Sequence, residues 1–87
     1  DQMPAIEVRI PNRVGKEINR LPKRIMERVL PALEKLKRDP LLGLRLRGKL
    51  EEYCKFRIGD YRIVYRYNEK TKILDILKVE HRQGVYR

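Results

Sequence analysis

The stretch Tyr53-Cys54-Lys55-Phe56-Arg57-Ile58-Gly59-Asp60-Tyr61-Arg62-Ile63-Val64-Tyr65-Arg66-Tyr67 decides how the rest of the chain is interpreted. Residue types alternate on both sides of Gly59-Asp60, and a glycine-containing pair between two alternating runs is typical of a tight β-hairpin. The sequence therefore predicts two strands, over about residues 52–58 and 61–67, joined by a two-residue turn.

A two-residue turn fixes the predicted register of the hairpin. The opposed pairs are Ile58 and Tyr61, Arg57 and Arg62, Phe56 and Ile63, Lys55 and Val64, and Tyr53 and Arg66. Because side chains alternate faces along a strand, one face is predicted to be a core face. It carries Cys54, Phe56, Ile58, Tyr61, Ile63 and Tyr65. The other face carries Tyr53, Lys55, Arg57, Arg62 and Arg66. Like charges that face each other cost stability, so this second face requires an anionic partner or full solvation.

Length and charge bound the rest of the interpretation. The chain has 87 residues, which predicts a single domain over residues 1–87 with one modest core. Lysine and arginine number 22 against 12 aspartate and glutamate, a net charge of +10. Such an excess favours a polyanionic partner, either a nucleic acid, a ribosome or an acidic protein.

Cys54 is the only cysteine, so the chain forms no internal disulfide, which fits a reducing compartment. We interpret it as a small buried hydrophobe. No apolar run is long enough for a membrane span or a signal sequence, and we expect a cytoplasmic protein with no membrane partner.

The segments before the hairpin predict one strand and two helices. Residues 5–10 alternate as a strand and end at Pro11. Asn12 is a candidate N-cap for a short helix over about residues 12–20. Pro22 suits the first turn of a second helix. Pro31 lies inside this helix and predicts a kink there, or a break into two shorter helices.

After the hairpin, residues 72–80 predict a last strand. Ile73, Leu77 and Val79 would lie on one side, and Leu74 and Ile76 on the other. Apolar residues on both sides suggest a strand that is covered on both faces and does not lie at an edge. The fold class is therefore α+β, in the order β-α-α-β-β-β, with a helical pair packed on a small, mainly antiparallel sheet.

Two further patterns stay open. The alternating leucines and arginines of residues 44–47 are typical of an edge strand or of a surface that contacts RNA. We predict RNA contacts for Arg45, Arg47 and Lys49. Asp75 and Glu80 are too isolated in sequence to suggest a carboxylate pair. No metal-ligand spacing, phosphate loop or nucleophile elbow is present, so no metal or cofactor is predicted.

The chain resembles the RelE/ParE superfamily of bacterial and archaeal toxin–antitoxin modules. The resemblance covers nearly the whole chain and is carried by Leu46-Arg47-Gly48, Tyr53-Cys54-Lys55-Phe56-Arg57, Gly59-Asp60-Tyr61-Arg62-Ile63-Val64-Tyr65, and His81-Arg82 with Val85-Tyr86-Arg87. It implies a toxin controlled by an acidic, RelB-like antitoxin. RelE-like members are ribosome-dependent endoribonucleases that cut mRNA in the decoding site.

Resemblance to the RelE branch implies a set of catalytic positions. They are Lys55, Arg57, Arg62, His81, Arg82 and Tyr86, with Arg66 as a further RNA contact. In this reaction the RNA 2′-OH attacks its own phosphate, so the enzyme must align the backbone, neutralise charge and move two protons. The arginines suit the phosphate, because guanidinium groups fit phosphate oxygens. Lys55 stabilises charge or donates a proton. Tyr86 is a candidate base or a surface on which a nucleobase stacks, and His81 is a candidate base or acid.

Two other interpretations remain at this point. The superfamily also contains ParE-like members, which inhibit DNA gyrase and generally lack the cleavage residues. The other alternative is a non-catalytic RNA-binding module. A row of cations on an exposed strand is usually a solvated surface and does not by itself indicate catalysis.

Overall fold

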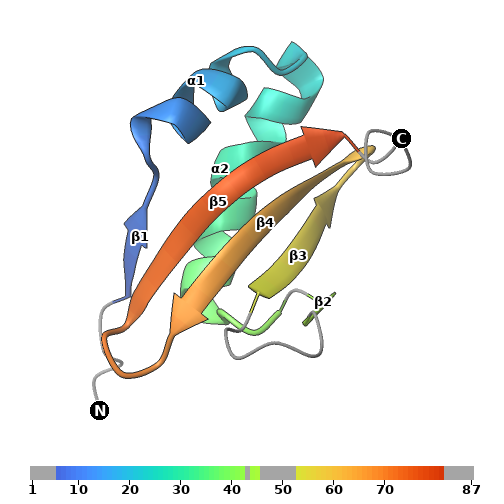
Figure 1. Cartoon of the computed structure of the whole chain (residues 1–87). Coiled ribbons are helices and arrows are strands. Elements are labelled where there is room, and N and C mark those ends of the chain that lie inside the picture. The colour runs from blue at the N-terminus through green and yellow to red at the C-terminus, as the bar shows by residue number, and fades with distance from the viewer. Residues whose placement is uncertain (1–5, 43, 46–52, 82–87) are drawn as a thin grey trace.

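Two helices pack on one face of a five-stranded mixed sheet in the computed structural model of the chain (Figure 1). The structure describes residues 6–42, 44–45 and 53–81. In chain order the elements are β1 (Glu7–Arg9), α1 (Asn12–Asn19), α2 (Lys23–Arg38), β2 (Leu44–Arg45), β3 (Tyr53–Ile58), β4 (Tyr61–Asn68) and β5 (Ile73–His81). The predicted order is confirmed, with the two-residue strand β2 as an addition.

The strand order in the sheet is β1-β5-β4-β3-β2. Strand β1 runs parallel to β5, and every other neighbouring pair is antiparallel. The sheet is therefore mainly antiparallel, as predicted. Strand β5 lies between β1 and β4, which confirms that it is not an edge strand.

One β-bulge interrupts the pairing of β4 with β5. Tyr65 lies opposite Ile76, whereas its neighbour Val64 lies opposite Lys78, so Leu77 has no residue facing it on β4. An extra residue on one strand reverses the alternation of faces beyond it. Before Leu77 the even-numbered residues of β5 point to the core, whereas after Leu77 the odd-numbered residues do.

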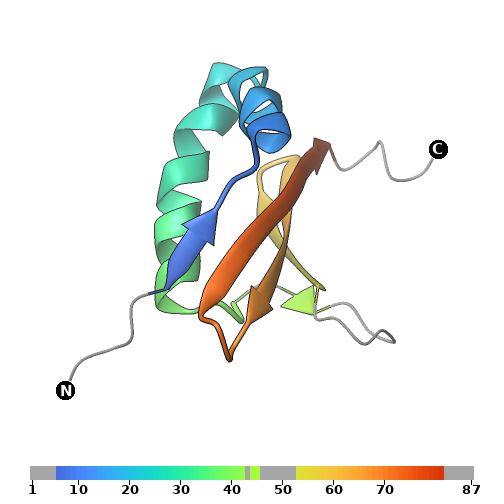
Figure 2. The same cartoon turned by 60° about the vertical axis from the view of Figure 1, so that its left-hand side comes forward.

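The bulge corrects the predicted faces of β5. Leu74, Ile76 and Val79 are all buried, at 0%, 1% and 9% exposure, so Val79 shares the core face with Leu74 and Ile76. A regular two-residue period predicts Val79 on the side of Ile73 and Leu77, which is wrong because the bulge shifts the alternation. The prediction that both faces of β5 are covered is also wrong for the described elements. Both helices lie on the same side of the sheet (Figure 2).

The helices begin one residue away from the predicted caps. Pro11 occupies the N-cap position of α1, and its carbonyl oxygen accepts a 2.9 Å hydrogen bond from the backbone N–H of Gly15. Asn12 is the first helical residue, so its predicted role as N-cap was wrong. Pro22 caps α2 from just outside, where proline fits because the first turn needs no N–H donor. Helix α2 runs through Pro31 without interruption, which excludes the predicted break.

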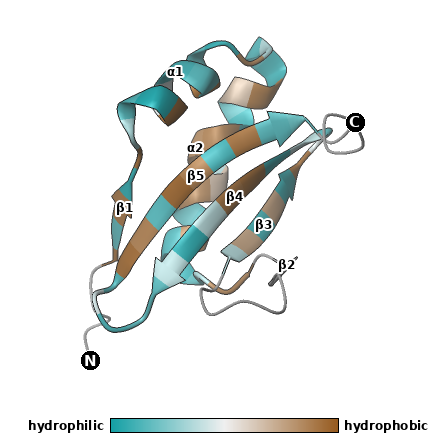
Figure 3. Ribbon diagram, viewed as in Figure 1, coloured by the Kyte–Doolittle hydropathy of each residue, from teal (hydrophilic) through white to brown (hydrophobic). Residues whose placement is uncertain are grey.

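The core lies between the helices and the inner face of the sheet. Hydrophilic and hydrophobic residues alternate along the strands, as a one-sided sheet requires (Figure 3). The largest fully buried side chains come from both layers: Val14, Ile25, Leu36, Cys54, Ile63, Tyr65, Leu74 and Ile76. Burial of Cys54 at 1% exposure confirms its interpretation as a small hydrophobe.

Candidate functional site

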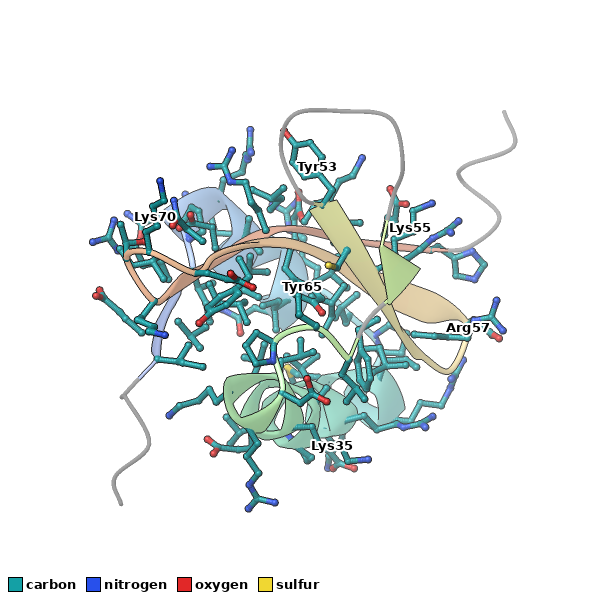
Figure 4. The ribbon with its side chains drawn as sticks, turned by 90° about the horizontal axis from the view of Figure 1, so that it is seen from below. Lys35, Tyr53, Lys55, Arg57, Tyr65 and Lys70 are labelled. Carbon is teal, nitrogen blue, oxygen red and sulfur yellow. The ribbon has the colours of Figure 1, made fainter. Side chains whose placement is uncertain are left out.

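The hairpin of β3 and β4 has the predicted register at every position. Arg57 lies opposite Arg62, Lys55 opposite Val64 and Tyr53 opposite Arg66. These residues share the sheet face that points away from the helices, which we call the cationic face. Figure 4 shows Tyr53 and Lys55 on this side, with Tyr65 on the other side, between the sheet and α2. Two adjacent strands thus bring four predicted site residues onto one surface: Lys55, Arg57, Arg62 and Arg66.

Strand β5 adds two carboxylates to the cationic face. Glu80 lies opposite Arg62, and its Oε2 is 3.2 Å from the Arg62 Nε. Asp75 lies opposite Arg66, with 3.8 Å between Oδ2 and the Arg66 Nη2. The second oxygen of Glu80 is 3.1 Å from the Nζ of Lys78. The carboxylates of β5 therefore neutralise part of the positive charge on this face.

Sequence reasoning missed this role of Asp75 and Glu80. Residues five apart on a regular strand point to opposite faces, which is why the two looked unrelated. The bulge at Leu77 brings them to the same face. The signal in the sequence was the failure of residues 73–79 to follow one clean alternation, since Ile76 and Leu77 are adjacent apolar residues.

Lys55 and Arg57 differ from the other cations of this face. Within residues 6–42 and 53–81, neither has an ion-pair partner, and the Arg57 side chain is exposed. Positive charge is therefore least compensated on β3, next to Arg62. Such a site can bind an anion with several guanidinium and ammonium groups at once, and an RNA phosphate is an anion of that kind.

His81 lies apart from the cationic face. The register pairs it with Tyr61, which lies opposite Ile58 on the core face of the hairpin. The two rings meet edge to face, with centroids 4.8 Å apart and an interplanar angle of 85°. His81 therefore lies on the core side of the sheet, at the end of β5 and next to Tyr61.

The remaining predicted positions are only partly covered. Arg45 belongs to β2 and lies opposite Cys54, so residues 44–45 form an edge strand, which was one of the two alternatives for this segment. Arg47, Lys49, Arg82 and Tyr86 lie outside the described residues, and their roles stay predictions. In the part of the chain that the structure describes, neither helix is long and apolar enough to cross a bilayer.

A family model described as the ParE toxin of the type II toxin–antitoxin system parDE matches residues 8–86. The chain belongs to this toxin family. Together with the relatives described below, the match places the chain in the RelE/ParE superfamily and identifies it as a RelE-like toxin of a type II toxin–antitoxin system.

The relatives carry RelE-type names. The chain is 35% identical over 82 residues to the toxin RelG of Mycobacterium tuberculosis, covering 92% of this chain and 94% of that one. Its fold matches the RelE–RelB complex of Pyrococcus horikoshii with a TM-score of 0.80 and 30% identity, over 91% of this chain and 97% of that one. It matches the RelBE2 toxin–antitoxin complex of M. tuberculosis with a TM-score of 0.77 and 33% identity, over 91% and 100% of the two chains.

Proposed function

We propose that this toxin is a ribosome-dependent endoribonuclease that cleaves mRNA in the decoding site and so inhibits translation. The observation that carries the proposal is the cationic face, on which Lys55, Arg57 and Arg62 are brought together from two adjacent strands. The net charge of +10 and the similarity to RelE toxins support the same function. We therefore propose that the toxin acts in the cytoplasm, and that its partner there is a 70S-type ribosome that carries mRNA.

The proposed reaction is an internal transesterification of RNA. A base removes the proton of the 2′-OH, and the resulting oxygen attacks the adjacent phosphorus. The bond from phosphorus to the 5′-oxygen breaks, and that oxygen takes a proton from an acid as it leaves. The products are a 2′,3′-cyclic phosphate and a free 5′-OH. Negative charge accumulates on the phosphate oxygens in the transition state, so fixed cations there lower the barrier.

The residues of this chain divide between two tasks. Arg57, Arg62 and Arg82 are assigned to the phosphate oxygens, because arginine stays charged and forms forked hydrogen bonds. Lys55 adds charge next to them. For the proton transfers we propose Tyr86 as the base or as a surface on which a nucleobase stacks. His81 is the second candidate, although its place on the core side of the sheet separates it from the cationic face. Arg45, Arg47, Lys49 and Arg66 are proposed to bind RNA outside the reacting phosphate.

An acidic, RelB-like antitoxin is the proposed controller. The relatives from P. horikoshii and M. tuberculosis were solved as complexes with their antitoxins. A partly disordered acidic chain that folds on the toxin gains charge complementarity at the cationic face. Its binding there would exclude RNA from the same surface.

The decisive experiment uses purified 70S ribosomes programmed with a defined mRNA. Primer extension locates the cut, and the ends are tested for a cyclic phosphate and a 5′-OH. The proposal expects cleavage only on the ribosome, and none when the nucleotide before the cut carries a 2′-deoxy sugar. Cleavage of that deoxy substrate, or intact mRNA at saturating toxin, would contradict it. Arg82→Ala and Tyr86→Ala are expected to reduce cleavage, and undiminished activity in both removes these two site assignments.

Inhibition of DNA gyrase is the second candidate, favoured by the ParE description of the matching family model. It predicts that the toxin blocks plasmid supercoiling by purified gyrase while ribosome-bound mRNA stays intact. A third outcome, in which the toxin does neither and bacteria tolerate its expression without an antitoxin, would indicate a non-catalytic RNA-binding module.

A further inference from the structure

Three charged residues form one row across the middle of the cationic face. Arg57 on β3 lies opposite Arg62 on β4, and Arg62 lies opposite Glu80 on β5. Arg62 is therefore the only member of the row with a like charge on one side and an opposite charge on the other. Directly opposed like charges repel, and directly opposed unlike charges attract, so both neighbours move the Arg62 guanidinium towards β5.

We propose that Glu80 is a positioning residue that holds the Arg62 guanidinium over β5 and keeps it apart from that of Arg57, so that one RNA phosphate fits between them. This inference rests on the proposed function, because it assigns Glu80 a part in the same reaction. Glu80 acts through Arg62 and need not touch the RNA.

The geometry and burial of the pair support this role. The Arg62 Nε and the Glu80 Oε2 are 3.2 Å apart, and the two side chains are only 17% and 23% exposed. Ion pairs between freely exposed side chains contribute little, but charges that are largely shielded from water attract each other more strongly, and this attraction favours the orientation of Arg62 towards Glu80. The other carboxylate oxygen, Oε1, lies 3.1 Å from the Nζ of Lys78, but the Lys78 side chain is 55% exposed, so Arg62 is the better shielded of the two cations beside Glu80.

The Arg66–Asp75 pair provides a matched control on the same face. It also joins an arginine of β4 to a carboxylate of β5, but its charged atoms are 3.8 Å apart and its side chains are 37% and 32% exposed. Asp75→Asn and Glu80→Gln each remove one negative charge from the cationic face and keep the side-chain size. Any effect of net charge on RNA binding is therefore common to both variants.

The test measures kcat and KM for ribosome-bound mRNA in both variants. If Glu80 positions Arg62, Glu80→Gln lowers kcat by about 10- to 100-fold, the range expected when a reacting group is misplaced by about 1 Å. Asp75→Asn leaves kcat within about twofold of the native value, and KM changes equally in the two variants. Equal kcat values in the two variants, whether reduced or not, would overturn the inference.

A background without Arg62 separates positioning from a direct role of Glu80. Because Glu80 acts through Arg62, adding Glu80→Gln to Arg62→Ala should leave the residual kcat unchanged. A further fall of 10-fold in the double variant would show that Glu80 acts independently, and would also overturn the inference.

The position of Arg62 has its own readout, which does not need activity. In protein labelled with 15N-arginine, the Nε–Hε resonance of Arg62, assigned with Arg62→Lys, should shift in Glu80→Gln and stay in place in Asp75→Asn. An Arg62 resonance that ignores Glu80→Gln refutes the positioning role whatever the kinetics. Wild-type toxin that fails to cleave mRNA refutes the proposed function instead, and with it the catalytic purpose of the pair.

Discussion

The hydroxyl of Tyr65 donates a 2.8 Å hydrogen bond to the backbone carbonyl oxygen of Pro40. Tyr65 is fully buried in β4, and Pro40 follows the end of α2, so this bond joins the helical layer to the middle of the sheet. It fixes the point from which the chain leaves α2 for β2. The Tyr65 side chain therefore links the hairpin to the segment that follows α2.

Replacing Tyr65 by phenylalanine removes the hydrogen bond to Pro40 and keeps the ring in the core. A buried hydrogen bond contributes about 1 kcal/mol to stability, so we expect the melting temperature of Tyr65→Phe to fall by about 4–8 °C. Tyr67→Phe is the control, since the Tyr67 hydroxyl, although the residue is buried, has no hydrogen-bond partner among the described residues. Thermal unfolding followed by circular dichroism measures both, and equal melting temperatures would contradict the account.

Gly59 and Gly15 should respond in opposite ways to the same substitution. Gly59 has a φ of +65°, and an added Cβ would lie 3.2 Å from both the Arg28 Nη1 and the Ile25 Cδ1. Alanine there is expected to destabilise the fold by about 1 kcal/mol or more. Gly15 lies in α1 with nothing within 4 Å of the added Cβ, so Gly15→Ala should stabilise by about 0.5–1 kcal/mol. Urea unfolding curves give both values, and changes of the same sign would be inconsistent with the structure.

The loss of stability on shortening a leucine side chain of α2 to alanine should depend on which face of the helix carries that leucine. Leu36 is fully buried against the sheet, and Leu36→Ala is expected to cost about 2–5 kcal/mol. Leu30 lies on the same helix with 65% of its surface exposed, so Leu30→Ala should stay within about 0.5 kcal/mol of the native protein. The free energy of unfolding in urea distinguishes them. A large loss in Leu30→Ala would mean that the outer face of α2 is covered by something else.

Removal of a cation should matter on the cationic face and not at the other end of the sheet. Arg57→Ala and Arg62→Ala are each expected to lower kcat for ribosome-bound mRNA by about 10²–10³-fold, as loss of one oxyanion-stabilising group does. Lys70→Ala carries the same charge change in the turn between β4 and β5, far from Arg57 (Figure 4), and should cleave normally. An equal loss in all three would indicate bulk attraction of RNA rather than a site. Melting temperatures near the native value are the check that the variants fold.

Sequence patterns predicted the hairpin correctly because its information is local. The turn pair at Gly59-Asp60 and the alternation on either side of it determine the register, and every predicted pair is present. The same alternation predicted that Lys55, Arg57, Arg62 and Arg66 share one face, and the register confirms it. Helix bounds were also predicted to within about two residues, which is the usual uncertainty of a helix end.

What the sequence did not reveal depends on contacts between distant segments. The bulge at Leu77 arises from the pairing of β5 with β4, and no residue in that strand marks it as a glycine would. The ion pairs of Glu80 and Asp75 follow from that bulge. The core-side position of His81 likewise follows from its pairing with Tyr61, some twenty residues earlier.

The strand order has a consequence for synthesis of the chain. Strand β5, the last described element, lies between β1 and β4, and its parallel pairing joins Glu7 to Ile73. Both helices leave the ribosome long before the strand that completes the surface on which they pack. A nascent chain that stops before residue 73 therefore lacks the strand on which α1 packs and leaves apolar side chains exposed, a state that chaperones and proteases recognise. The native sheet forms only when translation of this segment is complete.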